Sequence, residues 1–160
     1  MSRPGLPISP IEIRLTKDKL SLISRVLSST PDAYKHTQVL LELADKLGYR
    51  DDPVAETTVL AMVADSALQA EDFTRASEAC QRMVSIVLAL PRADERAQAT
   101  SEICWVSCFQ LGRQHEFADS EEKLKLLGRA LELCPADRLP DILVAWRKLE
   151  AEHLLSLIHI

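Results

Sequence analysis

The sequence predicts an all-α protein: an α-solenoid of about seven antiparallel helices, paired as hairpins of the tetratricopeptide (TPR) or HEAT kind. Three observations predict this fold. Apolar residues recur at steps of three and four along most of the 160-residue chain, which is the period of an α-helix. Only 4 residues are Gly and 4% are aromatic, whereas Leu and Ala are abundant, and this composition favours helix over strand. The alternation typical of a strand is confined to residues 11–15.

Residues 59–90 show the helical period most clearly and are predicted to form two antiparallel helices joined by a polar turn at residues 69–72. The positions that share an apolar face are Val59, Val63, Ala67 and Ala70 in the first helix and Phe73, Ala76, Cys80, Val84 and Val87 in the second. Asp72 is predicted to cap the second helix, because its carboxylate can accept hydrogen bonds from unpaired amides of the first turn. Alanines crowd the joint, so the two helices can approach closely.

The chain before this pair begins with residues 1–15, which carry Pro and Gly and are predicted to be an irregular or poorly ordered entry. A short helix is predicted from about Thr16. Residues 30–32 (Thr-Pro-Asp) then start a second helix with a cap, a proline of preset φ and an acid in the first turn. This helix is predicted to run to Leu47, with Gly48 as its left-handed stop.

Similar signals bound the later helices. Residues 51–53 (Asp-Asp-Pro) start the third, and Pro91 ends the fourth because proline cannot continue the hydrogen-bond ladder. A fifth helix is predicted from about Asp94 to Leu111, with Gly112 ending it. The sixth begins at Phe117 with the apolar stripe Leu124, Leu127, Leu131 and Cys134, and the seventh, capped by Asp137, has the stripe Leu139, Ile142, Trp146 and Leu149.

A weak internal repeat accompanies these helices. Residues 68–73 and 111–117 each place an aromatic residue just after a hairpin turn, 44 residues apart, which is in the range of two-helix solenoid repeats. The solenoid is predicted to span residues 16–153. Residues 154–160 are apolar and uncapped, and two interpretations are open: the buried end of a helix, or a non-native tail, since residues 156–160 resemble translated adapter read-through.

Charge and hydropathy exclude two classes of function. The formal net charge is −5, the sequence pI is about 5.4, and no run of Lys or Arg exceeds two residues, so direct nucleic-acid binding is not expected. No apolar stretch reaches the roughly 18 residues of a membrane span, so membrane insertion is not expected either. Four cysteines lie among apolar neighbours with no secretory h-region before them, which favours a reducing compartment.

The sequence offers one candidate metal site. Cys104 and Cys108 can share a helical face, and His115 is the nearest histidine. Zinc requires about four ligands, and no second cysteine pair is present, so the expectation is that the cysteines pack as small hydrophobic residues. The sequence from His115 to Phe117 also lacks the second histidine of a zinc-protease helix.

The remaining candidates also have structural explanations. The acidic pairs at 51–52 and 121–122 lie at helix starts, where carboxylates stabilise the positive helix end. Trp105 and Trp146 lie on apolar stripes and are expected to pack in the core. No catalytic, cofactor-binding, metal-binding or partner-binding residue is therefore predicted, and the chain is not expected to be an enzyme.

Four long runs carry a family resemblance: KLSLISRVLSSTPDAYKHTQVLLELADKLG at 19–48, VLAMVADSALQAEDF at 59–73, SEICWVSCFQLGRQHEF at 101–117 and KLKLLGRALELCP at 123–135. They resemble the neuroblastoma-amplified sequence protein family, in its secretory-pathway helical domain. The resemblance covers most of residues 16–151 except the connection at 91–96. Members of that family are much longer than 160 residues, so the resemblance implies a fragment.

The resemblance implies a helical scaffold in a multisubunit tether at the endoplasmic reticulum, which captures Golgi-derived vesicles in retrograde transport. The implied partners are tethering-complex subunits and SNARE proteins of that membrane, and the implied location is cytoplasmic and peripheral to the endoplasmic reticulum membrane. Animal members are also linked to nonsense-mediated mRNA decay, which would act here through protein contacts. A generic TPR-like peptide-binding adaptor is the alternative, although such grooves usually present Asn and this chain contains none.

Overall fold

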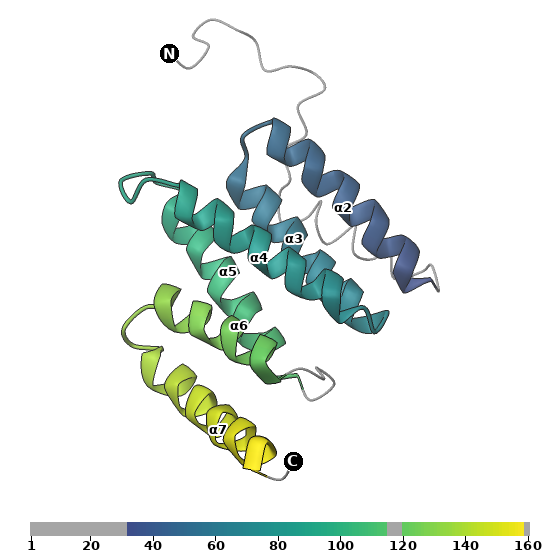
Figure 1. Ribbon diagram of the computed structural model, residues 1–160. Coiled ribbons are helices and arrows are strands. Elements are labelled where there is room, and N and C mark those ends of the chain that lie inside the picture. Colours follow the sequence, from purple (N-terminus) through teal and green to yellow (C-terminus); the bar gives the residue numbers. More distant parts are fainter. Residues whose placement is uncertain (1–31, 115–119, 159–160) are drawn as a thin grey trace, which may run out of the picture. The chain divides into compact units, whose positions relative to one another are not determined.

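The computed structural model describes residues 32–114 and 120–158, and all the regular structure in them is helical (Figure 1). The helices are α2 (Ala33–Tyr49), α3 (Pro53–Gln69), α4 (Phe73–Ala89), α5 (Ala97–Gly112), α6 (Ser120–Leu133) and α7 (Leu139–Ile158), within one compact unit, Asp32–Ile160. The all-α solenoid prediction is confirmed, and residues 32–114 and 120–158 contain six helices. The entry at 1–15 and the helix from Thr16 lie outside the described residues.

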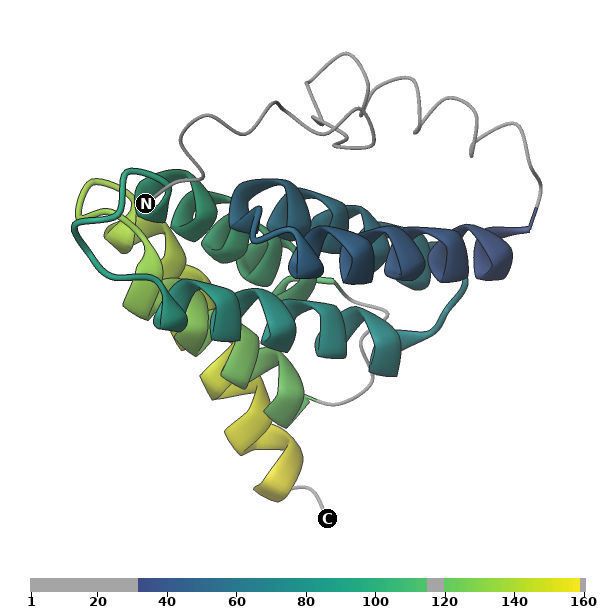
Figure 2. The ribbon, with the colours of Figure 1, turned by 90° about the horizontal axis from the view of Figure 1, so that it is seen from above.

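Successive helices pack on one another as antiparallel hairpins. The connection from α4 to α5 is longer than a tight turn. Contacts also skip one helix along the chain, since α3 packs on α5 and α4 touches α6. In Figure 2, α2 and α4 run across the view whereas α7 lies at a steep angle to them, so helix direction turns along the stack. This is the packing of a helical-hairpin solenoid.

The core is centred on α3, which contacts α2, α4 and α5. The middle of its predicted apolar face is fully buried, as is the facing side of α4, whereas the predicted Ala70, Phe73 and Val87 are half-buried. The residues with no exposed surface are Val59, Leu60, Val63 and Ala67 in α3 and Ala76, Cys80 and Met83 in α4. Three of these seven are small residues, so the two backbones approach closely and leave no room for a longer side chain at Ala76. The predicted central hairpin is therefore confirmed.

Two turns of the same form join α2 to α3 and α3 to α4. In each, an acidic residue takes the left-handed conformation, Asp51 with φ 53° and Glu71 with φ 59°. The following aspartate amide bonds back five residues, from Asp52 to Leu47 O at 3.4 Å and from Asp72 to Ala67 O at 2.8 Å, which is the Schellman pattern of a helix end.

The two aspartates then cap the next helix. The carboxylate of Asp52 accepts from the amide of Ala55 at 3.2 Å, and that of Asp72 accepts from the amide of Arg75 at 3.1 Å, as the sequence predicted. The prediction for Gly48 was wrong, because α2 continues to Tyr49 and Asp51 supplies the left-handed residue instead.

Three other predicted boundaries shift. Asp32 is the cap of α2 rather than a first-turn residue, since its carboxylate accepts from the amide of Lys35 at 3.3 Å. Helix α5 begins at Ala97, not Asp94, because the amide of Asp94 bonds to Pro91 O and that of Ala97 bonds to Asp94 O as turns. Phe117, the predicted start of the sixth helix, lies outside the described residues.

The stripes of the last two helices were only partly predicted. In α6 the buried residues are Leu126, Leu127 and Ala130, whereas the predicted Leu124, Leu131 and Cys134 are half-buried. In α7 only Ile142 is buried. Helix α7 continues through residue 154 to Ile158, and the division of the chain at 153, with a tail at 154–160, stays a prediction.

We expect Ala76→Glu to destabilise the fold by about 3–5 kcal/mol, because a carboxylate without a partner would be forced between α3 and α4. Urea unfolding followed by circular dichroism measures the loss. Thr74→Glu, at an exposed position of the same helix, should leave the midpoint nearly unchanged. An unchanged midpoint for Ala76→Glu would show that the α3–α4 packing is wrong.

We expect Glu71→Gly to stabilise the fold by about 0.5–1 kcal/mol, because glycine removes the left-handed strain at a small entropic cost. Glu71→Ala keeps the strain while removing the charge, so its melting temperature should stay near that of the unmodified protein. Equal shifts in the melting temperatures of the two variants would mean that the carboxylate, and not the backbone, sets the effect.

Candidate functional site

The structure brings together three of the four cysteines. Cys80 of α4 and Cys104 and Cys108 of α5 are fully buried. A hydrogen bond with Cys108, together with burial, raises the pKa of Cys104. The hydrogen bond with Cys104 lowers the pKa of Cys108, but a hydrogen bond with Cys80 and burial raise it by more. The two α5 thiols are therefore held protonated, unlike the thiolates that attack substrates or bind metals.

The other metal and catalytic candidates do not join this cluster. His115 lies outside the described residues, as does His159. Cys134 is half-buried at the end of α6, and no interaction of Cys134 with the other three cysteines is found among the described residues. His153 instead pairs its Nδ1 with the hydroxyl of Ser120 at 2.7 Å. Within residues 32–114 and 120–158, no group of three or more His, Cys, Asp and Glu side chains is placed to hold a metal ion.

The acidic pairs have structural contacts. Asp52 caps α3, and Asp51 contacts a distant arginine through its carbonyl and carboxylate. Glu122 lies in the first turn of α6, as predicted, and its carboxylate also accepts hydrogen bonds from Ser77 at 2.5 Å and from Gln81 at 3.2 Å. It therefore connects α6 to α4.

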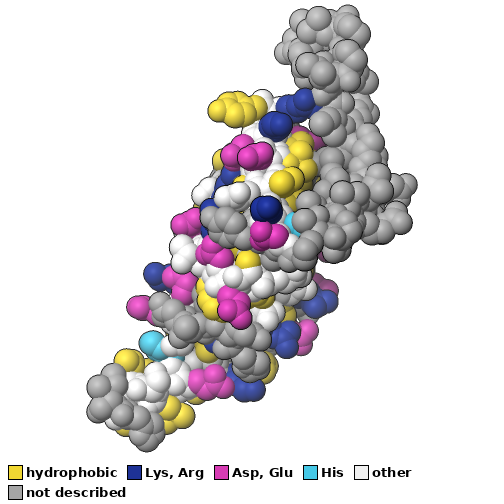
Figure 3. Space-filling view, turned by 90° about the vertical axis from the view of Figure 1, so that its right-hand side faces the viewer, with side chains coloured by type: hydrophobic (Ala, Val, Ile, Leu, Met, Phe, Trp, Pro, Cys, Tyr) yellow, Lys and Arg dark blue, Asp and Glu magenta, His cyan; other side chains and the backbone are white. Residues whose placement is uncertain are grey.

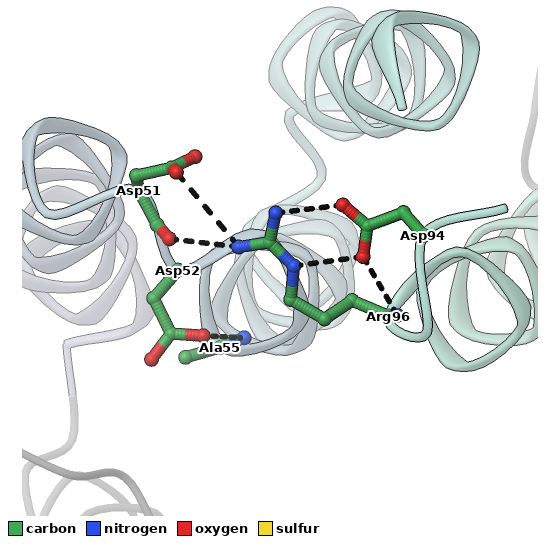
Figure 4. Close-up of polar contacts among 5 residues, drawn as sticks. All are labelled: Asp51, Asp52, Ala55, Asp94 and Arg96. Carbon is green, nitrogen blue, oxygen red and sulfur yellow. Dashed lines mark hydrogen bonds and ion pairs between the residues drawn. The ribbon is translucent and has the colours of Figure 1, made fainter. Parts of the chain in front are cut away.

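The arginine that contacts Asp51 is Arg96, just before α5 (Figure 4). Its guanidinium donates to both carboxylate oxygens of Asp94, at 2.8 and 3.0 Å, and to the carbonyl oxygen of Asp51 at 3.2 Å. The sequence predicted only a polar connection at 91–96. These contacts fix that connection against the α2–α3 turn, 45 residues earlier in the chain.

A second arginine connects three helices. Arg82 of α4 donates to Asp45 of α2 at 2.7 Å and to Glu56 of α3 at 2.9 Å. Double ion pairing of one guanidinium favours a single geometry of the three helices. Arg82 therefore fixes α2, α3 and α4 relative to one another, and Arg96 fixes the start of α5 relative to the α2–α3 turn.

Among the described residues, open grooves lie between neighbouring helices. The α3–α5 groove has a volume of about 820 Å³, the α4–α6–α7 groove about 740 Å³ and the α5–α6–α7 groove about 550 Å³. The α4–α6–α7 groove is lined by the apolar residues Cys80, Val84, Leu88, Leu124, Leu126, Gly128 and Trp146, with Glu121, Glu122, Lys125, Arg129 and Glu132 among its polar residues. The sequence did not predict these grooves, because each includes helices that are not consecutive in the chain.

The two tryptophans differ in their surroundings. Trp105 is buried, as predicted, with the guanidinium of Arg138 at 5.8 Å from its ring centroid. Trp146 is only half-buried and lines the α4–α6–α7 groove beside Gly128, where an added Cβ would lie 3.1 Å from the ring. Leu88 in the same groove is 65% exposed. This groove therefore combines the apolar and aromatic surface that protein interfaces favour.

The charged side chains form no single-sign patch on the face drawn in Figure 3, where acidic and basic groups alternate along the helices. Hydrophobic side chains are visible where α7 ends, consistent with the exposure of Leu154, Leu155, Leu157 and Ile158. In the part of the chain that the structure describes, no helix has the length and apolar character needed to cross a bilayer.

We expect Asp94→Asn to lower stability at neutral pH and to have a diminishing effect in acid. Arg96 lowers the pKa of Asp94 from 3.8 to about 2, so the folded state binds the proton less tightly than the unfolded state. The stabilisation by Asp94 is therefore present above about pH 4 and lost as pH falls toward 2. Urea unfolding of both proteins between pH 2 and pH 7 tests this. Glu78→Gln, at an exposed position, should show no such convergence with the unmodified protein.

Comparison with known proteins adds a family match. A family model described as secretory pathway protein Sec39 matches residues 1–159. The human "NBAS subunit of NRZ tethering complex" is 30% identical over 152 residues, which cover 94% of this chain and 6% of that protein. "MAG2-interacting protein 2" of Arabidopsis thaliana is 23% identical over 152 residues, 92% of this chain and 6% of that protein. The chain thus spans 6% of the length of these two relatives.

Proposed function

The chain belongs to the family of the secretory pathway protein Sec39, and from this premise we propose that it is a scaffold segment of a vesicle-tethering complex at the endoplasmic reticulum. In this role it binds other tether subunits and SNARE proteins and so contributes to Golgi-to-endoplasmic-reticulum retrograde transport. It acts in the cytoplasm, peripheral to the membrane and held there by its partners, without catalysis.

The observation that carries this proposal is the family match over residues 1–159, together with the similarity to a human protein that is named as a subunit of a tethering complex. The resemblance identified from runs such as residues 19–48 agrees with that match. Since the chain is a small part of the length of both relatives, the role of the whole protein is assigned to this segment only as a proposal.

The architecture supports a binding role. A stack of hairpins offers long grooves and helix faces to other proteins rather than a closed pocket for a small substrate. The α4–α6–α7 groove is the surface we assign to a tether partner, because Leu88 and Trp146 provide exposed and half-exposed apolar area in one place. Large apolar and aromatic side chains of this kind supply most of the energy at protein interfaces.

Two alternatives make different predictions. A TPR-like adaptor would bind short peptides rather than folded tether subunits. A regulator of nonsense-mediated mRNA decay would act through protein contacts with decay factors. Direct RNA binding would be retained at low salt and lost at high salt, because it depends on phosphate contacts.

We expect the immobilised chain to retain purified tether subunits and endoplasmic-reticulum SNARE proteins, and Leu88→Glu to reduce that retention at least several-fold. Val39→Glu changes an exposed apolar residue of α2 that does not line this groove, so it should bind as the unmodified chain does. Retention of short peptides without tether subunits would favour the adaptor. Retention of decay factors alone would favour the decay role, and salt-sensitive retention of RNA would contradict the scaffold proposal.

A further inference from the structure

Helix α5 has apolar residues on more than one side. Of its 16 residues, Ala97–Gly112, only Glu102 is charged, and its apolar residues do not form a single stripe. A helix of this composition is normally covered all round. The side containing Cys104, Trp105 and Cys108 is buried, whereas Ile103 and Val106 on another side are only half-buried.

These half-buried residues line the α3–α5 groove. Its apolar surface comes from Ala61, Ala64 and Leu68 of α3 and from Ala99, Ile103, Val106 and Leu111 of α5. Three of these seven residues are alanines, so the apolar floor is shallow and another backbone can approach closely. Along α5 the lining runs from Ala99 to Leu111, roughly 18 Å at 1.5 Å per residue, which matches about three turns of a helix.

Two carboxylates lie at the groove, Asp65 on α3 and Glu102 on α5. No hydrogen bond or ion pair to either carboxylate is found among the residues that the structure describes, in contrast to Glu56 and Asp94, which pair with arginines. Although Asp65 is exposed at the mouth of the groove, the protein around it raises its pKa by desolvation, and no nearby cation opposes this effect. Cationic groups that enter the groove could form ion pairs with both carboxylates.

The groove's basic lining residue does not fill that role. Arg113 lies at the C-terminal end of α5, where its guanidinium is 5.0 Å from the ring centroid of Phe109. Asp65 lines the groove from α3 and Glu102 lines it from α5. The groove thus combines an apolar floor with negative charge on both of its walls.

We propose that the α3–α5 groove is a docking site for an amphipathic helix of another protein, whose apolar stripe is flanked by Lys or Arg side chains. The apolar stripe packs on the alanine-rich floor, and the cations pair with Asp65 and Glu102, one on each wall. This is recognition of a helix in a groove, with anchors spaced at three and four residues.

The charges argue against two other occupants. A second copy of this chain would carry its own net charge of −5, and an identical groove would present its own carboxylates to Asp65 and Glu102. An anionic membrane surface would be repelled by the same two groups. A basic helix satisfies both the apolar floor and the unpaired carboxylates, and the inference does not depend on which complex the partner belongs to.

The test uses the full chain and a synthetic helical probe of about 15 residues, with Leu at positions that share one face and two flanking Lys, labelled for fluorescence anisotropy. A twin peptide carries Glu in place of Lys. We expect the Lys peptide to bind and the Glu peptide to bind at least tenfold more weakly. The double variant Asp65→Asn and Glu102→Gln, which preserves side-chain volume, should weaken binding of the Lys peptide about tenfold.

Two further variants give the controls. Glu42→Gln with Glu78→Gln removes the same charge from exposed positions outside the groove and should leave the affinity unchanged. Ala99→Trp fills the groove from an exposed position and should abolish binding of both peptides, with thermal melting confirming that the chain remains folded. Absence of Lys-peptide binding, equal affinity of the two peptides, or equal loss in the two double variants would overturn the proposal. The peptide assay contains no tether protein, so its failure would not contradict the tether-subunit proposal, and failure of the tether-subunit assay would not contradict the groove proposal.

Discussion

The close contact of α3 with three neighbouring helices is the constraint on which the rest of the structure depends. Helices α2, α4 and α5 all pack on α3, and Val59, Val63 and Ala67 are completely buried there. Small side chains at these joints set the distance between backbones, so the tight turns before and after α3 must reverse the chain in a few residues. Left-handed Asp51 and Glu71 make that reversal possible, and the aspartate after each caps the helix that follows.

Most of the fold could be predicted from the sequence where the cause is local. The caps Asp52 and Asp72 and the stop before Pro91 act within one turn of helix, so the residues alone indicate them. Gly48 misled the prediction because the bonds that end α2 are set by the turn after it, where the amide of Asp52 reaches the carbonyl of Leu47. The start of α5 shifted for a similar reason, since Arg96 bonds to Asp94 and to a distant turn.

Surface features were harder to predict because they depend on which helices become neighbours. The stripe of α6 follows contacts with both α5 and α7, which bury Leu126 and Ala130 in place of Leu124 and Leu131. Trp146 was expected in the core but lines a groove between three helices. One signal for the α3–α5 groove was present in the sequence: Asp65 interrupts an otherwise apolar part of α3, and a lone charge on such a helix has no local explanation.

The distribution of polar contacts separates a rigid part of the stack from its binding surfaces. Arg82 and Arg96 connect α2, α3, α4 and the start of α5, and they compensate the carboxylates with which they pair. In contrast, among the described residues no arginine pairs with Asp65 or Glu102, and the side chain of Leu88 is largely exposed. A scaffold needs both kinds of residue, because paired charges hold its helices in register, whereas uncompensated charges select and orient a partner and exposed apolar side chains supply binding energy. The same helices that build the core of this chain therefore also present its candidate binding surfaces, on the sides that the core does not use.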